Sequence, residues 1–174
     1  MKPTSILAAA LVLASGAAAA ALPRRDLPPV TPEENNFILE GIIDVFGNRR
    51  FDNMASLFTA DANYFVLGDL EPFTGDHTIP DTVKQARKVF NAFQEYDFTI
   101  VSRTVTSERA ILEATVRGTR PDDDGEPVVY RQTAVLILNT VRDPVDGRVR
   151  IKVLREYLDL VTLQKFAEEV GMFD

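Results

Sequence analysis

The chain has 174 residues, no cysteine and a formal net charge of −7 at pH 7. The lack of cysteine excludes a disulfide framework, and the acidic balance argues against nucleic acid and anionic membrane surfaces, which select basic patches. No apolar run after residue 25 reaches the length of a membrane-spanning helix, so we expect a small molecule as the partner.

Residues 1–25 have the pattern of a secretory leader. Lys2 supplies a positive start, and a short apolar stretch and a run of small residues follow it. This order is typical of a signal peptide and is too short for a membrane span. Arg24-Arg25 looks like a dibasic processing site, although it can also be an ordinary basic pair. The sequence therefore predicts secretion, with a signal peptide at 1–21, a short propeptide at 22–25 and one domain at 26–174.

Removal of this leader leaves 149 residues, the size of a single domain with a sizeable core. The leader carries three of the 19 basic residues and none of the 26 acidic ones, so the mature net charge becomes −10. Such a charge favours solubility and a neutral or small-molecule partner.

Three helices are expected in the first part of the mature chain. Thr31 can cap the first, Pro32 suits its first turn and Glu34 completes a capping box. Apolar residues then recur at three- and four-residue steps, which predicts an inward face of Phe37, Ile38, Gly41, Ile42, Val45 and Phe46. Shorter helices are expected at about 51–58 and 80–95, with strands at 61–67 and 71–74 and a loop at 75–78.

The second half of the chain is rich in strands. We expect four long antiparallel strands at 98–106, 110–120, 128–140 and 148–158, and a closing helix at 162–170. The segment 122–125 reads as a hairpin turn. Four strands in a meander need one face covered, and the three early helices can cover it. A strongly curved sheet wrapped on these helices would enclose a cavity.

The last strand carries the sharpest candidate for chemistry. Regular alternation puts six residues on one face, which we expect to be concave because its early members are apolar: Val149, Ile151, Val153, Arg155, Tyr157 and Asp159. Asp159 beside Arg155 would stay ionised and could abstract a proton, with Tyr157 as a helper. With the opposite parity Glu156 is the candidate instead. Asp159 can also simply cap the closing helix.

His77 is the only histidine in the chain and has an unperturbed pKa near neutrality. It is expected in a loop that borders the mouth of the cavity, as a general base or as a hydrogen-bond donor to a ligand. A solvated loop histidine is the simpler interpretation.

Four further residues are candidates for ligand binding. Tyr64 can supply a hydroxyl, and the rings of Phe37 and Phe90 can form an apolar wall as part of the core. One of the neighbours Tyr130 and Arg131 must face the cavity. Arg131 could neutralise an enolate or carboxylate, or it could form a cross-strand charge pair.

The sequence has no His-Glu-x-x-His motif and no glycine-rich phosphate loop, so no metal or cofactor is expected.

Three segments resemble SnoaL-like proteins of the nuclear-transport-factor-like superfamily. They are Leu57-Phe58-Thr59-Ala60-Asp61-Ala62, the loop Phe73-Thr74-Gly75 before Ile79, and Arg155-Glu156-Tyr157-Leu158-Asp159 before the last helix. The resemblance spans the mature chain and implies an α+β cone-shaped barrel: a strongly curved antiparallel sheet around three N-terminal helices, with a short C-terminal helix. The leader resembles those of proteins secreted by filamentous fungi.

The resemblance also carries functional expectations, and they remain divided. In the polyketide cyclases of the family an acidic residue at the end of the last long strand acts in acid–base chemistry, which implies that role for Asp159. One hypothesis is a cofactor-independent cyclase, isomerase or dehydratase acting on an apolar polyketide or terpenoid metabolite. The alternative is a non-catalytic secreted binder of a small hydrophobic ligand, because this fold does not settle function. The outer face of the sheet commonly forms homodimers in this fold.

Overall fold

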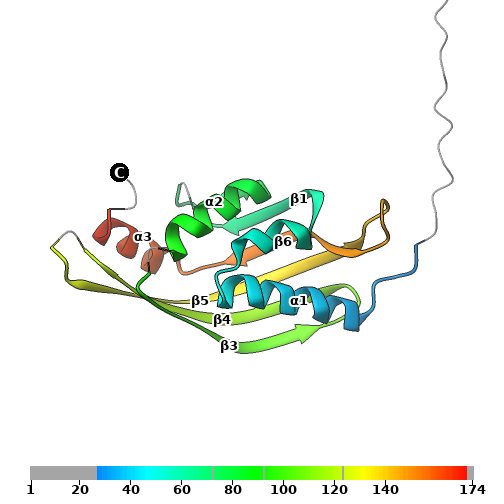
Figure 1. Ribbon diagram of the computed structural model, residues 1–174, viewed down its shortest axis with the longest axis horizontal. Helices are drawn as coiled ribbons and strands as arrows, with labels where there is room; N and C mark the ends of the chain where they lie inside the picture. The colour runs from blue at the N-terminus through cyan, green and yellow to red at the C-terminus, as the bar shows by residue number, and fades with distance from the viewer. Residues whose placement is uncertain (1–26, 72, 92, 123, 172–174) are drawn as a thin grey trace, which may run out of the picture.

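The computed structural model describes residues 27–171 except 72, 92 and 123 (Figure 1), so the expected leader and its dibasic pair lie outside the described residues. The helices are α1 (Pro32–Gly47), the 3-10 helix η1 (Phe51–Leu57), α2 (Ile79–Phe90) and α3 (Leu160–Glu169). The strands are β1 (Phe58–Leu67), β2 (Gly75–His77), β3 (Glu95–Val105), β4 (Arg109–Pro121), β5 (Pro127–Arg142) and β6 (Val149–Tyr157). No helix in the described part of the chain is both long and apolar enough to cross a membrane.

All six strands form one sheet in the order β2-β1-β6-β5-β4-β3. The strands β3 to β6 form the expected antiparallel meander. β1 joins this meander parallel to β6, which makes the sheet mixed. The row of strands ends at β2 and β3, so the sheet is not closed. The predicted α+β fold, with helices at the N-terminus and a short closing helix, is confirmed.

The helices cover one face of the sheet (Figure 1). α1 packs on β3, β4 and β6, α2 packs on β1 and η1, and α3 packs on β5. A sheet with one covered face needs alternating apolar residues on that face, and β5 supplies them through Ala134, Leu136 and Leu138, all of which are buried.

The start of α1 follows the predicted capping box, because Thr31 accepts from the Glu34 amide and Glu34 accepts from the Thr31 amide. The predicted inward position of Phe37 is wrong, since 74% of this side chain is exposed. The buried face is rotated to one side of it and includes Asn35 and Leu39. Asn35 donates to the Thr106 carbonyl at 2.7 Å and accepts from Thr140, which pins the helix to the sheet.

The strands β1 and β3 each begin three residues earlier than expected, at Phe58 and Glu95, and two other segments differ more. The second strand is at Gly75–His77 rather than 71–74, because this segment pairs with β1. The third helix stops at Phe90, and Phe93 turns inward to lie over Gly118 of β4. A side chain at Gly118 would put its Cβ 2.5 Å from the Phe93 ring, so this close approach requires glycine there.

A β-bulge in β6 determines which side chains reach the helices. Asn139 of β5 pairs with Val153, but the next residue, Thr140, pairs with Ile151. Lys152 is therefore an extra residue on β6 with no partner in the register, and a bulge of this kind reverses the alternation beyond it. Ile151 and Leu154 are consequently both fully buried on the helix side although they are three residues apart.

The core consists of two apolar clusters. The larger one lies between α1, η1 and the sheet, and the smaller one surrounds Phe93, Tyr130 and Phe166 below α3. Phe90 and Leu158 pack against both clusters.

Candidate active site

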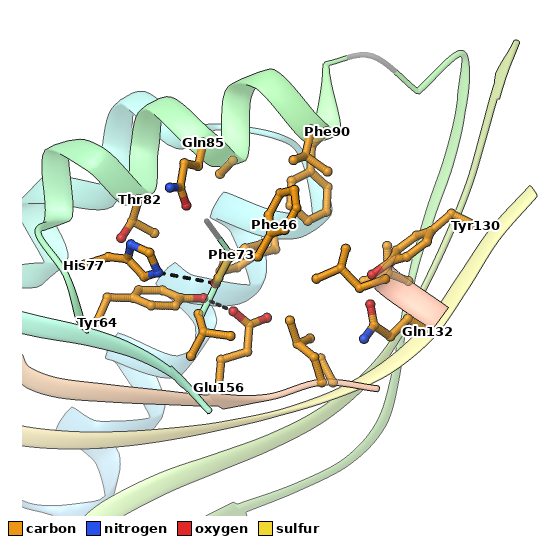
Figure 2. A pocket seen from close by; sticks show the side chains of 17 residues that line it. Phe46, Tyr64, Phe73, His77, Thr82, Gln85, Phe90, Tyr130, Gln132 and Glu156 are labelled. Atoms are coloured by element: carbon orange, nitrogen blue, oxygen red, sulfur yellow. Dashed lines mark hydrogen bonds between the residues drawn. The ribbon is translucent and has the colours of Figure 1, made fainter. Parts of the chain in front are cut away.

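A pocket lies where these two clusters meet (Figure 2). It contains about 750 Å³ of empty space, a volume that includes the solvent at its open mouth. Most of its wall is apolar and comes from Phe46, Val66, Phe73, Ala86, Val89, Phe90, Val116, Ala134, Leu158 and Leu163. Its polar lining consists of Tyr64, His77, Thr82, Gln85, Tyr130, Gln132 and Glu156.

Glu156 is the one carboxylate of this lining. It pairs with Leu136 across β5 and β6 and therefore shares the helix-facing side of the sheet. The bulge at Lys152 produces this orientation, because an unbroken alternation from Ile151 would turn Glu156 outward. Glu156 therefore lies on β6, a strand inside the sheet, and its side chain points into the pocket (Figure 2).

The Glu156 side chain is half-buried, and its carboxyl has few polar partners in the pocket. Its Oε2 accepts one hydrogen bond, from the Tyr64 hydroxyl at 2.6 Å, and it forms no ion pair with the described residues. Burial raises the pKa of Glu156 above the ordinary value of a glutamic acid, and the hydrogen bond from Tyr64 offsets part of that shift. A carboxyl in such surroundings can hold a proton and can also act as a base once it is ionised.

Tyr64 is 2% exposed and extends from β1 toward Glu156. Burial, together with the adjacent charge of Glu156, raises the pKa of Tyr64 well above that of an ordinary tyrosine. Its hydroxyl therefore remains protonated at neutral pH and acts as a hydrogen-bond donor.

His77 reaches the same end of the pocket. It pairs with Tyr64 in the antiparallel register of β1 and β2, so the two side chains share one face. Its Nε2 lies 3.3 Å from the Phe73 carbonyl oxygen. A carbonyl can only accept, so Nε2 carries the proton and Nδ1 of the neutral ring is left as an acceptor. The structure thus brings together three residues of the lining that the sequence singled out, namely Tyr64, His77 and Phe90.

The expected position of Asp159 in the pocket is wrong. Asp159 is the N-cap of α3, where its Oδ1 accepts from the amides of Val161 and Thr162. The hydrogen bonds from Thr162 lower the pKa of Asp159, which suits a capping carboxylate rather than a buried base.

The expected positions of Arg155 and Tyr157 on the concave face are also wrong, because both residues lie on the outer face of β6 and are exposed. The reason is again the bulge: the apolar start of the strand correctly identified the inner face, but the alternation reverses at Lys152. The inner residues of this segment are Leu154, Glu156 and Leu158.

Arg131 points away from the pocket and is exposed, whereas its neighbours Tyr130 and Gln132 are buried and line it. Phe37 lies outside the pocket on the exposed side of α1.

Gln132, Thr82 and Gln85 are lining residues that the sequence analysis did not identify. Gln132 could have been found, because it alternates in phase with Ala134 and Leu136. The bulge also left a signal, since the adjacent apolar pair Val153-Leu154 interrupts an otherwise alternating strand. In the described part of the chain no group of three or more histidine, aspartate or glutamate side chains could hold a metal ion.

Comparison with known proteins agrees with this architecture. The sequence profile of the SnoaL-like domain matches residues 39–149. No protein of curated function matches the sequence significantly.

Solved structures with the same fold come from several organisms. PrhC of Penicillium brasilianum is 14% identical with a TM-score of 0.63, covering 81% of this chain and 90% of its own. A Shewanella denitrificans protein assigned as a SnoaL-like polyketide cyclase is 12% identical with a TM-score of 0.59, covering 79% of this chain and 98% of its own. An LEH-like epoxide hydrolase of M. tuberculosis is 15% identical with a TM-score of 0.52, covering 82% of this chain and 94% of its own. At these identities the likeness establishes the fold alone.

Proposed function

The chain belongs to the SnoaL-like domain family, and on this basis we propose that it binds a small, largely apolar metabolite and moves a proton on it through Glu156. The reaction class is a cofactor-independent isomerisation or cyclisation of a polyketide- or terpenoid-type molecule.

The observation that supports this proposal is the Glu156 carboxyl in an apolar pocket with a single hydrogen bond from Tyr64. Burying a carboxylate without a cation is costly, and a merely structural position would accept an apolar residue more easily. A carboxyl with a raised pKa is a stronger base when ionised and a usable acid when protonated.

Each neighbour has a defined part in this proposal. Ionised Glu156 takes a proton from a carbon beside a carbonyl of the ligand, and Tyr64 donates a hydrogen bond to the carboxylate. His77 is a second acid–base group at this end, and Phe90 contributes to the apolar wall. The names of fold neighbours, which include a polyketide cyclase and an epoxide hydrolase, favour chemistry on small molecules.

A non-catalytic binder is the second candidate. The hydrogen bond from Tyr64 satisfies one oxygen of Glu156, and such a pair could orient a ligand without reacting with it. The two candidates differ in one measurable property, because only the first requires proton exchange at a carbon of the ligand.

The test measures that exchange. Native mass spectrometry first identifies metabolites that co-purify with the protein. These metabolites, with a panel of small cyclic ketones, enones and epoxides, are then incubated with the protein in D2O and followed by NMR. We expect deuterium incorporation or turnover with the wild type, and a rate lower by roughly 10²–10⁴-fold for Glu156→Gln.

Glu113→Gln is the matched control, because Glu113 is on β4 and outside the pocket lining, and it should keep the wild-type rate. A compound that binds to the wild type in the pocket and is never exchanged or converted would favour the binder and contradict catalysis by Glu156.

We further propose that the chain is of a secreted fungal type and that a second copy covers the outer face of its sheet. The pattern of residues 1–25 supports secretion. The outer face supports a homodimer because apolar residues gather on adjacent strands there, namely Ile111, Val135, Ile137, Val153 and Tyr157.

A further inference from the structure

We propose that Gln132 and Tyr130 form a second polar subsite in the pocket that selects ligands carrying a hydroxyl group. This inference rests on the proposed small-molecule function and specifies the class of its ligand: an apolar body with an alcohol or phenol group remote from Glu156.

The first observation is an unpaired acceptor. Gln132 is 4% exposed, and its Oε1 is buried with no hydrogen-bond partner among the described residues. Its amide cannot be turned over to remedy this, because Nε2 donates to the Asp159 carbonyl at 3.0 Å and that carbonyl can only accept. The Asp159 backbone therefore directs Oε1 away from itself. A buried polar atom left in this state is destabilising unless something donates to it.

The second observation is an unpaired donor beside it. Tyr130 is two residues from Gln132 on β5, so the two side chains share the pocket face. Its ring packs against Phe93, with centroids 5.7 Å apart, and against Phe166, with centroids 4.9 Å apart, and these two rings also contact each other. The hydroxyl turns into the pocket next to the Gln132 amide (Figure 2). This hydroxyl forms no hydrogen bond with the described residues.

The donor character of Tyr130 is permanent at physiological pH. Burial, reinforced by the charges of Glu156 and Asp159, raises the pKa of Tyr130. The subsite therefore offers one acceptor and one donor side by side in an otherwise apolar wall.

A hydroxyl group matches this arrangement, since it donates to Oε1 of Gln132 and accepts from Tyr130. A ketone or ether can only accept, so it would satisfy Tyr130 and leave Gln132 unpaired. A site built to hydrogen-bond a hydroxyl discriminates against analogues that lack it, because its own polar groups are then left unsatisfied.

Gln132 and Tyr130 lie on one side of Glu156, and Tyr64 and His77 lie on the other (Figure 2). Glu156 pairs with Leu136, and Gln132 is four residues away on the same strand, or about 14 Å of backbone at the rise of a strand. Ala134 lies between them and keeps the intervening floor apolar. The hydroxyl is thus a positioning group rather than the reacting one.

The test compares three probes of one shape: menthol, menthyl methyl ether and p-menthane. NMR titration of the labelled full domain gives their dissociation constants. For the wild type we expect menthol to bind roughly tenfold more tightly than the ether, as for one hydrogen bond. Gln132→Met should abolish the preference for menthol over the ether. Tyr130→Phe should weaken the binding of menthol and of the ether to the same extent and leave the affinity for p-menthane unchanged.

Equal affinities of all three probes for the wild type would overturn the subsite, as would a preference for menthol that survives both variants. If Gln132→Met does not fold, Tyr130→Phe tests the donor of the subsite, because it removes one oxygen and leaves the ring cluster in place. Unchanged affinities for menthol and the ether in this variant would overturn the subsite. Glu156→Gln separates the two proposals. If the protein prefers menthol over the ether but shows no Glu156-dependent proton exchange, the subsite is supported and catalysis by Glu156 is contradicted. If it shows Glu156-dependent exchange but no preference for menthol, catalysis is supported and the subsite is contradicted.

Discussion

At the scale of single residues, the hydrogen-bonded pair Glu156–Tyr64 is the central polar feature of the pocket. An ionised carboxylate prefers water, and Glu156 exchanges that water for one phenolic hydroxyl. Two opposing effects therefore act on its pKa: burial raises it and the hydrogen bond lowers it. Because burial and the hydrogen bond shift the pKa of Glu156 in opposite directions, a substitution that removes only one of them can separate the two effects.

Tyr64→Phe should raise the pKa of Glu156 further. The substitution removes the hydrogen bond that stabilises the charged form and leaves the burial in place. A hydrogen bond to a charged group stabilises that charge, and its loss removes the effect that lowers this pKa, so we expect the pKa to increase. NMR titration of the Glu156 carboxyl carbon measures it. An unchanged or lowered pKa would mean that Tyr64 does not stabilise the carboxylate.

Glu156→Gln should change how stability depends on pH. The folded-state pKa of Glu156 is raised above its unfolded value, so the folded state binds the proton more strongly and stability falls as pH rises through the folded-state pKa. Glutamine does not titrate and can still accept from Tyr64. Urea unfolding at pH 4 and pH 7 should therefore show the variant gaining stability over the wild type toward pH 7. A constant difference between the two pH values would contradict this.

At the scale of elements, the bulge in β6 and the cap of α3 organise the site together. The bulge at Lys152 turns Glu156 inward. The strand ends at Tyr157, and Asp159 then starts α3 with its side chain while its carbonyl orients Gln132. One short segment thereby positions both polar ends of the pocket.

Asp159→Ala should destabilise the protein by removing the cap of α3. Loss of an N-cap side chain leaves the amides of Val161 and Thr162 without their acceptor, and we expect the Tm to fall by roughly 2–4 °C. Asp159→Asn is the control, because asparagine caps as well as aspartate. Differential scanning calorimetry measures both variants. Equal losses in the two would show that the charge, and not the cap, is what matters.

At the scale of the whole molecule, the open sheet leaves one face to the helices and the other without cover from them. Ile111 and Ile137 are directly paired on the uncovered face, as are Val135 and Tyr157. These two apolar pairs adjoin the charged residues Arg155, opposite Ile137, and Glu113, opposite Val135. An apolar patch with charged neighbours of this kind can mark an interaction surface.

Ile137→Asp should convert the proposed dimer into a monomer, because it puts a charge in the middle of this patch. Analytical ultracentrifugation at micromolar concentration measures the change in mass. Val145→Asp is the matched control, since Val145 is 91% exposed in the loop after β5. A monomeric wild type would contradict the dimer outright.

Processing after Arg25 would make Asp26 the first residue of the proposed secreted chain. Arg142 binds the carbonyl oxygens of Pro28 and Pro29 at 2.9 and 3.2 Å, so the arm stays docked to the sheet once the leader is removed. Intact-mass measurement of protein secreted by a fungal host identifies the first residue. Arg25→Ala should prevent the second cleavage and leave a longer chain, whereas an unchanged mass would exclude processing at Arg24-Arg25.

Local signals in the sequence determined the element order. The capping box at Thr31, the hairpin turn after β4 and the alternating strands all depend on neighbouring residues, so they could be predicted without the fold. The sequence also pointed to Tyr64, His77 and Phe90, which line the pocket.

Only the tertiary structure decided which side chains of the last strand face the pocket. The alternation of β6 reverses at Lys152 because its register is set by hydrogen bonds to β5 and β1, strands that are remote in sequence or joined by a turn. A one-residue shift in such pairing exchanges the two faces of a strand. It therefore put Glu156 in the pocket and moved Arg155, Tyr157 and Asp159 out of it.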